Sequence, residues 1–102
     1  MNGFRFMLFV TGESGRSLQA ADNLRALCEA RVAGLYELEV IDVLDRPELA
    51  EEERIIATPT VIRLVPLPKR RVIGDLSDLS RAAIALDLPV AQDESLREGG
   101  GA

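Results

Sequence analysis

The sequence contains no histidine and only one cysteine, Cys28, in 102 residues. A single cysteine cannot form an internal disulfide or a CxxC redox pair. A chain without histidine also lacks the side chain most often used for acid–base catalysis and metal binding. We therefore expect no catalytic residue, no metal ion and no cofactor, and we predict that the protein is not an enzyme. Cys28 falls on the apolar side of a predicted helix, so we interpret it as a small core residue.

Long hydrophobic runs are absent as well. Charged residues or prolines interrupt every apolar stretch before it reaches the length of a membrane span, which predicts a soluble protein. The lone cysteine and an N-terminus unlike a signal peptide favour the cytoplasm. The net charge of −5 argues against binding to nucleic acid. A basic cluster of Lys69, Arg70 and Arg71 is typical of a solvated turn, and an acidic protein surface would suit it better than nucleic acid.

Length and composition favour one small domain. The chain has 102 residues, of which 47% are hydrophobic, enough for one core and too few for a second domain. Beyond residue 90 the sequence becomes polar, acidic and rich in glycine. We expect a folded domain over residues 1–90 and a disordered tail over residues 91–102.

The clearest local pattern lies in the centre of the chain. An apolar run there predicts a strand covered on both faces, formed by Leu38, Val40, Ile41 and Val43. Asp42 interrupts this run, and we interpret its carboxylate as a structural hydrogen-bonding group at the strand end. Asp45, followed by Pro47 and Glu48, forms a capping box, which predicts that a helix begins there.

Pro59 predicts where the next strand begins. Thr58 precedes a proline and is therefore disfavoured in the helical region, while Pro59 has no N–H to donate to a helix or sheet. We predict a strand over residues 60–65, a turn at residues 66–69 and an antiparallel strand over residues 70–73. Pro59 is also a candidate for a cis peptide bond.

The N-terminal part predicts a strand, a helix and a second, parallel strand. Residues 4–10 alternate apolar side chains on the two sides of a strand. Ser14 or Ser17 is expected to cap the helix that follows, and Gly34 to end it. The buried stripe of this helix is predicted to contain Leu18, Ala21, Leu24, Leu27 and Cys28. A strand over residues 36–43 completes a right-handed βαβ unit.

The C-terminal part predicts one more helix. Asp75 or Ser77 is expected to cap it, and Pro89 marks its limit. Its apolar positions are predicted to be Leu76, Leu79, Ala82, Ala83 and Leu86. Asp75 and Asp78 could suggest a metal pair, but roles as cap and first-turn residues of the helix explain both of them.

The resulting order, βαβαββα, predicts an α/β protein with a thioredoxin-like layout. In that layout a mixed four-stranded sheet carries helices on both faces. A redox enzyme of this fold would carry CxxC in the loop after the first strand, whereas this chain has TGESGRS at residues 11–17. We therefore expect the scaffold without the thiol chemistry.

Six segments occur in the order and spacing of one known family. They are LFVTG at 8–12, VIDVL at 40–44, PELAEE at 47–52, ATPT at 57–60, PLPKRRVIGDLSD at 66–78 and ALDL at 85–88. In these segments the chain resembles the KaiB family of bacterial circadian clock proteins, over roughly residues 4–90.

The resemblance implies a protein that binds the N-terminal ATPase ring of the hexameric kinase KaiC and modulates KaiC phosphorylation and output signalling. Family members displace a sensor histidine kinase whose own domain is similar to KaiB, and in cyanobacteria they trap KaiA on the ring. A KaiB-like adaptor in stress or two-component signalling, outside any clock, is the alternative function.

The resemblance also implies two folds. In the resting state of family members, a dimer or tetramer, the C-terminal half is rearranged, whereas the binding-competent monomer is thioredoxin-like. The KaiB resting fold is therefore the alternative to the thioredoxin-like layout, and the two states can differ by only a few kcal/mol.

Two partner-binding regions follow from the resemblance. The ring-binding face is expected to use the second helix and the loop after it, with Glu48, Leu49, Ala50, Glu52, Glu53, Arg54 and Ile55. Judged from its residues alone, an acidic helix of this kind is usually a solvated surface, and Leu49 and Ile55 also suit a core. A possible edge strand for a second partner contains Tyr36, Leu38, Glu39 and Val40, because a partner's strand can join such an edge.

Two departures from the family pattern bear on function. Many clock members have a lysine where this chain has Glu39, near the edge on which KaiA docks, and this charge reversal argues against KaiA as a partner. Members often have glycine in place of Ala85, and glycine inside a helix costs about 0.5–1 kcal/mol relative to alanine. We assign the bias between the two folds to Ala85 and Asp87, and expect the free chain to spend much of its time thioredoxin-like.

Overall fold

The computed structural model describes residues 3–90, which form four strands and three helices in the predicted order, βαβαββα. The strands are β1 (Phe4–Val10), β2 (Tyr36–Asp42), β3 (Thr60–Val65) and β4 (Arg70–Ile73). The helices are α1 (Gly15–Val32), α2 (Pro47–Glu52) and α3 (Leu79–Ala85). The tail predicted to be disordered lies outside the described residues.

The four strands form one mixed sheet in the order β2-β1-β3-β4. β1 and β2 are parallel, with Phe4 opposite Tyr36 and Val10 opposite Asp42, and β3 is antiparallel to both β1 and β4. Because β1 lies between two strands and is covered on both faces, its alternating apolar residues are all buried from Phe6 to Val10. The parallel β1–β2 pair confirms the predicted βαβ unit.

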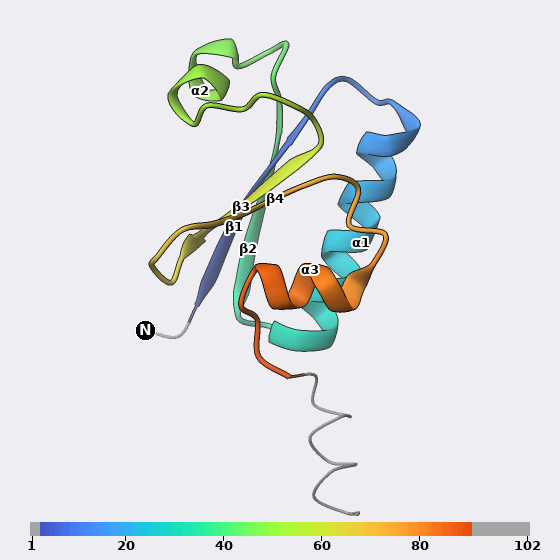
Figure 1. The fold of residues 1–102 in the computed structure, drawn as a ribbon, viewed down its shortest axis with the longest axis vertical. Helices are drawn as coiled ribbons and strands as arrows, with labels where there is room; N and C mark the ends of the chain where they lie inside the picture. The colour runs from blue at the N-terminus through green and yellow to red at the C-terminus, as the bar shows by residue number, and fades with distance from the viewer. Residues whose placement is uncertain (1–2, 91–102) are drawn as a thin grey trace, which may run out of the picture.

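One face of the sheet is covered by α1 and α3, which lie side by side in Figure 1. The core on this face combines β1 and β3 residues with both helices, and it includes Phe6, Leu8, Leu24, Leu27, Val61, Ala82 and Leu86. Ser14 caps α1, since its hydroxyl oxygen accepts a hydrogen bond from the Ser17 N–H at 3.2 Å. The predicted stripe is wrong at Leu18, which is 54% exposed, because Ala20 occupies the buried position instead.

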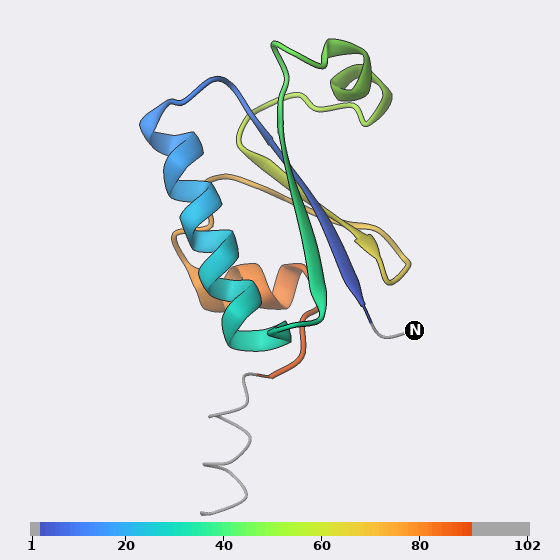
Figure 2. The same ribbon diagram turned by 180° about the vertical axis from the view of Figure 1, so that it is seen from behind.

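Among residues 3–90, only α2 and the loop that follows it pack on the opposite face of the sheet (Figure 2). Met7 and Phe9 of β1, Ile41 of β2 and Ile62 of β3 form a second, smaller core there. Helices on both faces of a mixed sheet confirm the predicted α/β, thioredoxin-like fold class. The Thr58–Pro59 peptide bond is cis, as predicted.

The prediction that the second strand is covered on both faces is wrong. β2 is an edge strand, and of its seven residues only Ile41 is buried. Val40, predicted to be covered, is 43% exposed. The apolar run resembles that of an interior strand, but the neighbour on its outer side is missing from the described sheet.

Two helix caps also differ from the prediction. The Asp45 capping box does not form, because Arg46 occupies the N-cap position of α2 and makes no side-chain cap bond. For α3 the cap is Asp78, whose carboxylate accepts from the Arg81 N–H at 3.1 Å, rather than Asp75 or Ser77. Leu76 precedes the helix with a φ of 63°, yet it is buried as predicted.

Candidate partner-binding surface

The second helix and its following loop are anchored by their apolar side chains. Leu49, Ala50 and Ile55 are partly buried and pack against the smaller core. The loop turns back on the helix through a hydrogen bond from the Ile55 N–H to the Ala50 carbonyl at 2.9 Å. These three members of the predicted ring-binding set therefore hold the segment on the sheet.

The exposed side of α2 is acidic. Glu48 and Glu52 point to solvent, as does Glu51 between them. Glu48 accepts a hydrogen bond from the Arg46 Nε at 2.8 Å, and this bond lowers the pKa of the Glu48 carboxyl. A helix of six residues thus presents a concentrated negative charge on the face turned away from the sheet.

Basic residues of β4 and its preceding turn brace the C-terminal end of this helix. The ammonium of Lys69 lies 3.4 Å from the carboxylate of Glu53, whose side chain is largely buried. Arg71 Nη2 donates to the Glu53 carbonyl at 2.7 Å and Nη1 to the Arg54 carbonyl at 3.3 Å. Positive charge at a helix C-terminus is favourable. All three residues of the basic cluster are exposed, as predicted for a solvated turn, but Lys69 and Arg71 also position the loop.

Two apolar residues that sequence reasoning missed flank the acidic helix. Leu44, in the connection before α2, is 70% exposed, and Ile56, in the loop after it, is 86% exposed. Each follows directly on a half-buried apolar residue, Val43 or Ile55, so the sequence pattern gave no sign that they would face solvent. Exposed apolar side chains beside charged ones suit a protein partner with an apolar centre and a basic rim.

The edge strand β2 is the second predicted region. Glu39 and Val40 are exposed, whereas Leu38 and Tyr36 are half-buried. The Tyr36 hydroxyl donates to the Glu29 carboxylate at 2.6 Å, and this bond raises the pKa of Tyr36 to about 12. Within residues 3–90 no strand pairs with the outer edge of β2, so its backbone is open to an additional strand.

The polar groups that could suggest chemistry have structural roles. Asp42 accepts hydrogen bonds from the Gly12 N–H at 3.1 Å and the Leu44 N–H at 2.9 Å, which confirms its predicted structural role. Cys28 is fully buried, as predicted, and burial raises the pKa of its thiol to about 12. A thiol that stays protonated is a poor nucleophile.

The aspartates before α3 also serve the backbone. Asp75 accepts from the Ser77 N–H at 3.0 Å, and hydrogen bonding by the Ser77 side chain, followed by this N–H, lowers the pKa of Asp75. Asp78 caps the helix. In the described part of the chain, no three acidic or thiol side chains gather into a possible metal site. Over the same residues, no helix has the length and apolar character needed to cross a membrane.

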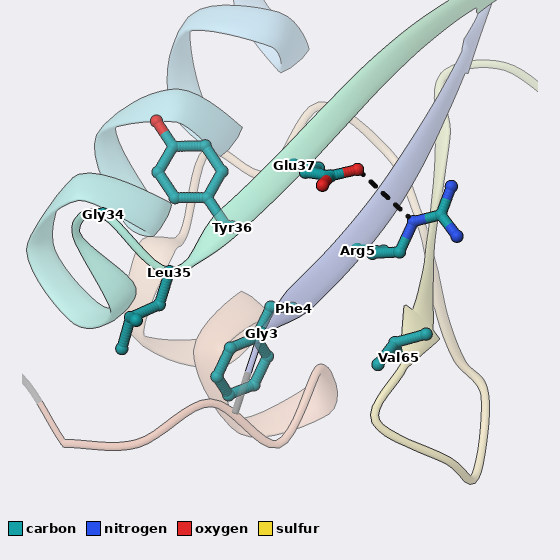
Figure 3. Close-up of a pocket in the computed structure, with 8 residues that line it drawn as sticks. All are labelled: Gly3, Phe4, Arg5, Gly34, Leu35, Tyr36, Glu37 and Val65. Carbon is teal, nitrogen blue, oxygen red and sulfur yellow. Dashed lines mark ion pairs between the residues drawn. The ribbon is translucent and has the colours of Figure 1, made fainter. Parts of the chain in front are cut away.

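A pocket of about 640 Å³ opens at the other end of the sheet, where β1 and β2 begin (Figure 3). Its walls are mostly apolar, and its charged groups are the ion pair of Arg5 and Glu37, with 3.6 Å between Nε and Oε1. Phe4 and Leu35 lie along its lower side in the figure. None of the residues predicted for the ring-binding face lines the pocket. Its charged lining residues are only Arg5 and Glu37, which form this surface ion pair.

Comparisons with known proteins agree with the fold. The family model described as KaiB domain matches residues 7–88. The circadian clock oscillator protein KaiB of Synechococcus sp. (strain RCC307) is 51% identical over 81 residues, which cover 79% of this chain and 74% of the relative. Among solved structures, the N-terminal domain of Synechococcus elongatus SasA superposes with a TM-score of 0.70 at 26% identity, covering 82% of this chain and 81% of that domain. Chloroplastic thioredoxin z has a TM-score of 0.67 at 24% identity, covering 82% and 76%.

Proposed function

Because the chain belongs to the KaiB family, we propose that it is a non-enzymatic, cytoplasmic regulator of a circadian clock. In this proposal its thioredoxin-like state binds the N-terminal ATPase ring of the KaiC hexamer and thereby modulates KaiC phosphorylation and output signalling. The observation that carries the proposal is the family match over nearly all of the described chain, together with relatives that are named clock oscillator proteins.

The binding surface that we propose comprises α2, its flanking apolar residues and the loop after it. Glu48 and Glu52 supply exposed negative charge, and Leu44 and Ile56 supply exposed apolar area on either side. The bonds from Lys69 and Arg71 hold the loop in place before a partner arrives. A pre-positioned surface loses less conformational entropy on binding than a mobile one.

The structural similarity to the SasA domain also supports the proposal that this chain binds the KaiC ring. Two related domains that share one scaffold can compete for one site, so a sensor kinase with a SasA-like domain would be displaced from the ring when this chain binds. The open edge of β2 offers a second site, where a further partner could add a strand. The exposed carboxylate of Glu39 on that edge disfavours an acidic partner strand, and we propose that KaiA is not bound there.

The proposal is tested by equilibrium binding of variants to the cognate KaiC hexamer. Glu52→Lys reverses one exposed charge of α2, and we expect at least about tenfold weaker binding. Glu13→Lys makes the same charge change on an exposed loop residue before α1, and should bind as the unmodified chain does. Equal affinities of the two variants would refute the assignment of α2.

A second pair of variants tests the apolar part of the surface. Ile56→Ser removes a side chain that contributes little to the core, and should weaken binding by about tenfold or more if Ile56 is an interface anchor. Leu67→Ser is the matched control, because Leu67 is 77% exposed in the turn between β3 and β4. If neither the acidic nor the apolar variants change binding, the ring is contacted elsewhere. If the unmodified chain does not bind KaiC, the adaptor role outside a clock becomes the better assignment.

A further inference from the structure

Arg63 is a charged residue in the core. It lies on β3 between β1 and β4, and its side chain is only 2% exposed. Within residues 3–90 it forms no ion pair with a carboxylate. Removing a guanidinium from water is costly unless other groups replace the lost hydrogen bonds. Main-chain carbonyls supply acceptors for both terminal nitrogens of Arg63, whereas its buried Nε has no partner within the described residues.

The guanidinium links β3 to two other segments of the chain. Nη1 donates to the Leu86 carbonyl at 2.8 Å and to the Asp87 carbonyl at 3.2 Å, both just past the end of α3. Nη2 donates to the Pro68 carbonyl at 2.8 Å, in the turn between β3 and β4. The rigid fork of an arginine can span two such directions at once, which the single ammonium of a lysine cannot.

The end of α3 explains why these carbonyls need a donor. The Leu88 N–H bonds to the Ala83 carbonyl at 2.9 Å and the Asp87 N–H to the Ile84 carbonyl at 3.0 Å, while Asp87 adopts a left-handed φ of 54°. This is the Schellman pattern of helix termination. It satisfies carbonyls inside the helix, and within residues 3–90 it leaves those of Leu86 and Asp87 without main-chain donors. The Arg63 guanidinium donates to both.

The helix depends on such support because it is short. α3 has seven residues, and of these only Ala82 and Ala83 are buried. An isolated helix of this length is not stable in water, so its persistence rests on docking. Leu86 and Leu88 add apolar contacts just beyond its end, and the positive charge of Arg63 lies at the C-terminal end, where the helix dipole favours it.

We propose that Arg63 is a positioning residue that holds the C-terminal segment, residues 79–88, docked as a helix against the sheet. When its guanidinium is lost, the carbonyls of Leu86, Asp87 and Pro68 remain without donors, and the segment opens as a unit. No residue of the βαβ part of the chain, residues 4–42, accepts a hydrogen bond from the guanidinium, so this part stays folded. This role concerns the free chain and does not depend on binding to KaiC.

The test is amide hydrogen exchange, measured residue by residue by NMR on the free chain. Arg63→Met keeps the length and the apolar stem of the side chain but removes all its donors. We expect the amides of Leu86 and Leu88 to exchange at least about tenfold faster, while the amides of β1 and α1 keep their rates. Arg71→Met is the matched control, since Arg71 also donates to two carbonyls but is exposed and braces the loop after α2.

Either of two results would overturn the proposal. One is unchanged exchange of Leu86 and Leu88 in Arg63→Met. The other is an equal acceleration in β1, α1 and α3, which would mean that Arg63 contributes only to global stability. Should Arg63→Met fail to fold, the same exchange measurement on Arg63→Lys tests the proposal. Lysine retains the positive charge but lacks the forked guanidinium. The same local opening, of smaller size, is then expected in Arg63→Lys, and its absence would refute the role.

Discussion

Replacing Ala85 with glycine tests how strongly the sequence favours a helix at the C-terminal end of the domain. Ala85 is the last residue of α3, and its side chain is exposed. Ala85→Gly therefore removes no buried contact, and its main effect is on the backbone. Glycine costs about 0.5–1 kcal/mol relative to alanine within a helix, and the terminal position places the expected cost at the lower end, near 0.5 kcal/mol.

This cost converts into a measurable change in local opening. A difference of about 0.5 kcal/mol changes an equilibrium constant by about two- to threefold. The amides of Leu86 and Leu88, which close the end of α3, should exchange faster by that factor. Ala26→Gly is the control, because Ala26 is exposed in the middle of the long helix α1. It should lower the free energy of global unfolding in urea by about 1 kcal/mol.

Two outcomes would contradict the reasoning. If Ala85→Gly leaves the exchange of Leu86 and Leu88 unchanged, alanine at this position does not bias the segment toward a helix. If it accelerates exchange in β1 as much as in α3, the C-terminal segment does not open separately, and the effect is one of overall stability. A change confined to residues 79–88 would support the assignment of Ala85 as a position that biases the fold.

Two further predictions concern the core and the first helix. Burial raises the pKa of Cys28 to about 12, whereas a cysteine in an unfolded chain titrates near pH 8.5, so only the unfolded state loses this proton as the pH rises above about 8.5. The free energy of unfolding should therefore fall with rising pH above that value, and Cys28→Ala should make the fall less steep; equal slopes in urea titrations of the two proteins would refute this. Ser14→Ala removes the cap of α1 and should lower the free energy of unfolding by about 1 kcal/mol. An unchanged urea midpoint would show that the 3.2 Å bond to the Ser17 N–H contributes nothing.

The strands of this fold were largely predictable, because proline and glycine mark where they begin and end. β3 and β4 have the predicted bounds because Pro59 precedes one and Gly74 follows the other. The position of a strand within the sheet was not predictable in the same way. β2 has the apolar run of an interior strand, but it lies at the edge because the chain crosses after β2 to the far side of β1 to form β3. No local pattern records that crossing, and only the family resemblance pointed to an edge strand here.

The missed caps have a local physical cause. Aspartate can bond to the N–H two residues ahead as readily as it caps a helix. Asp75 does so with the Ser77 N–H, and Asp78 becomes the N-cap of α3 instead. Before α2, the N–H groups of Asp45 and Arg46 both bond to the Asp42 carbonyl at 3.0 Å, so Asp45 lies within a turn and Arg46 becomes the N-cap residue.

The candidate site was predictable in its charge and not in its apolar contacts. The exposed carboxylates of α2 follow from the sequence, since charged residues of a short helix face solvent. Ile55 and Ile56 are adjacent and chemically identical, yet Ile55 packs on the core and Ile56 is 86% exposed. Which of the two faces solvent depends on how the loop turns back onto α2 through the hydrogen bond of the Ile55 N–H, and this is a property of the folded chain.

The most direct test of the proposed function is co-elution with the cognate KaiC hexamer in size-exclusion chromatography. The unmodified chain would be mixed with KaiC in ATP or in ADP and sampled from minutes to a day. The account predicts rapid co-elution that depends on the nucleotide, because the binding-competent fold is already populated in the free chain. Slow onset would contradict that population, and no co-elution at any time would contradict binding to the ring.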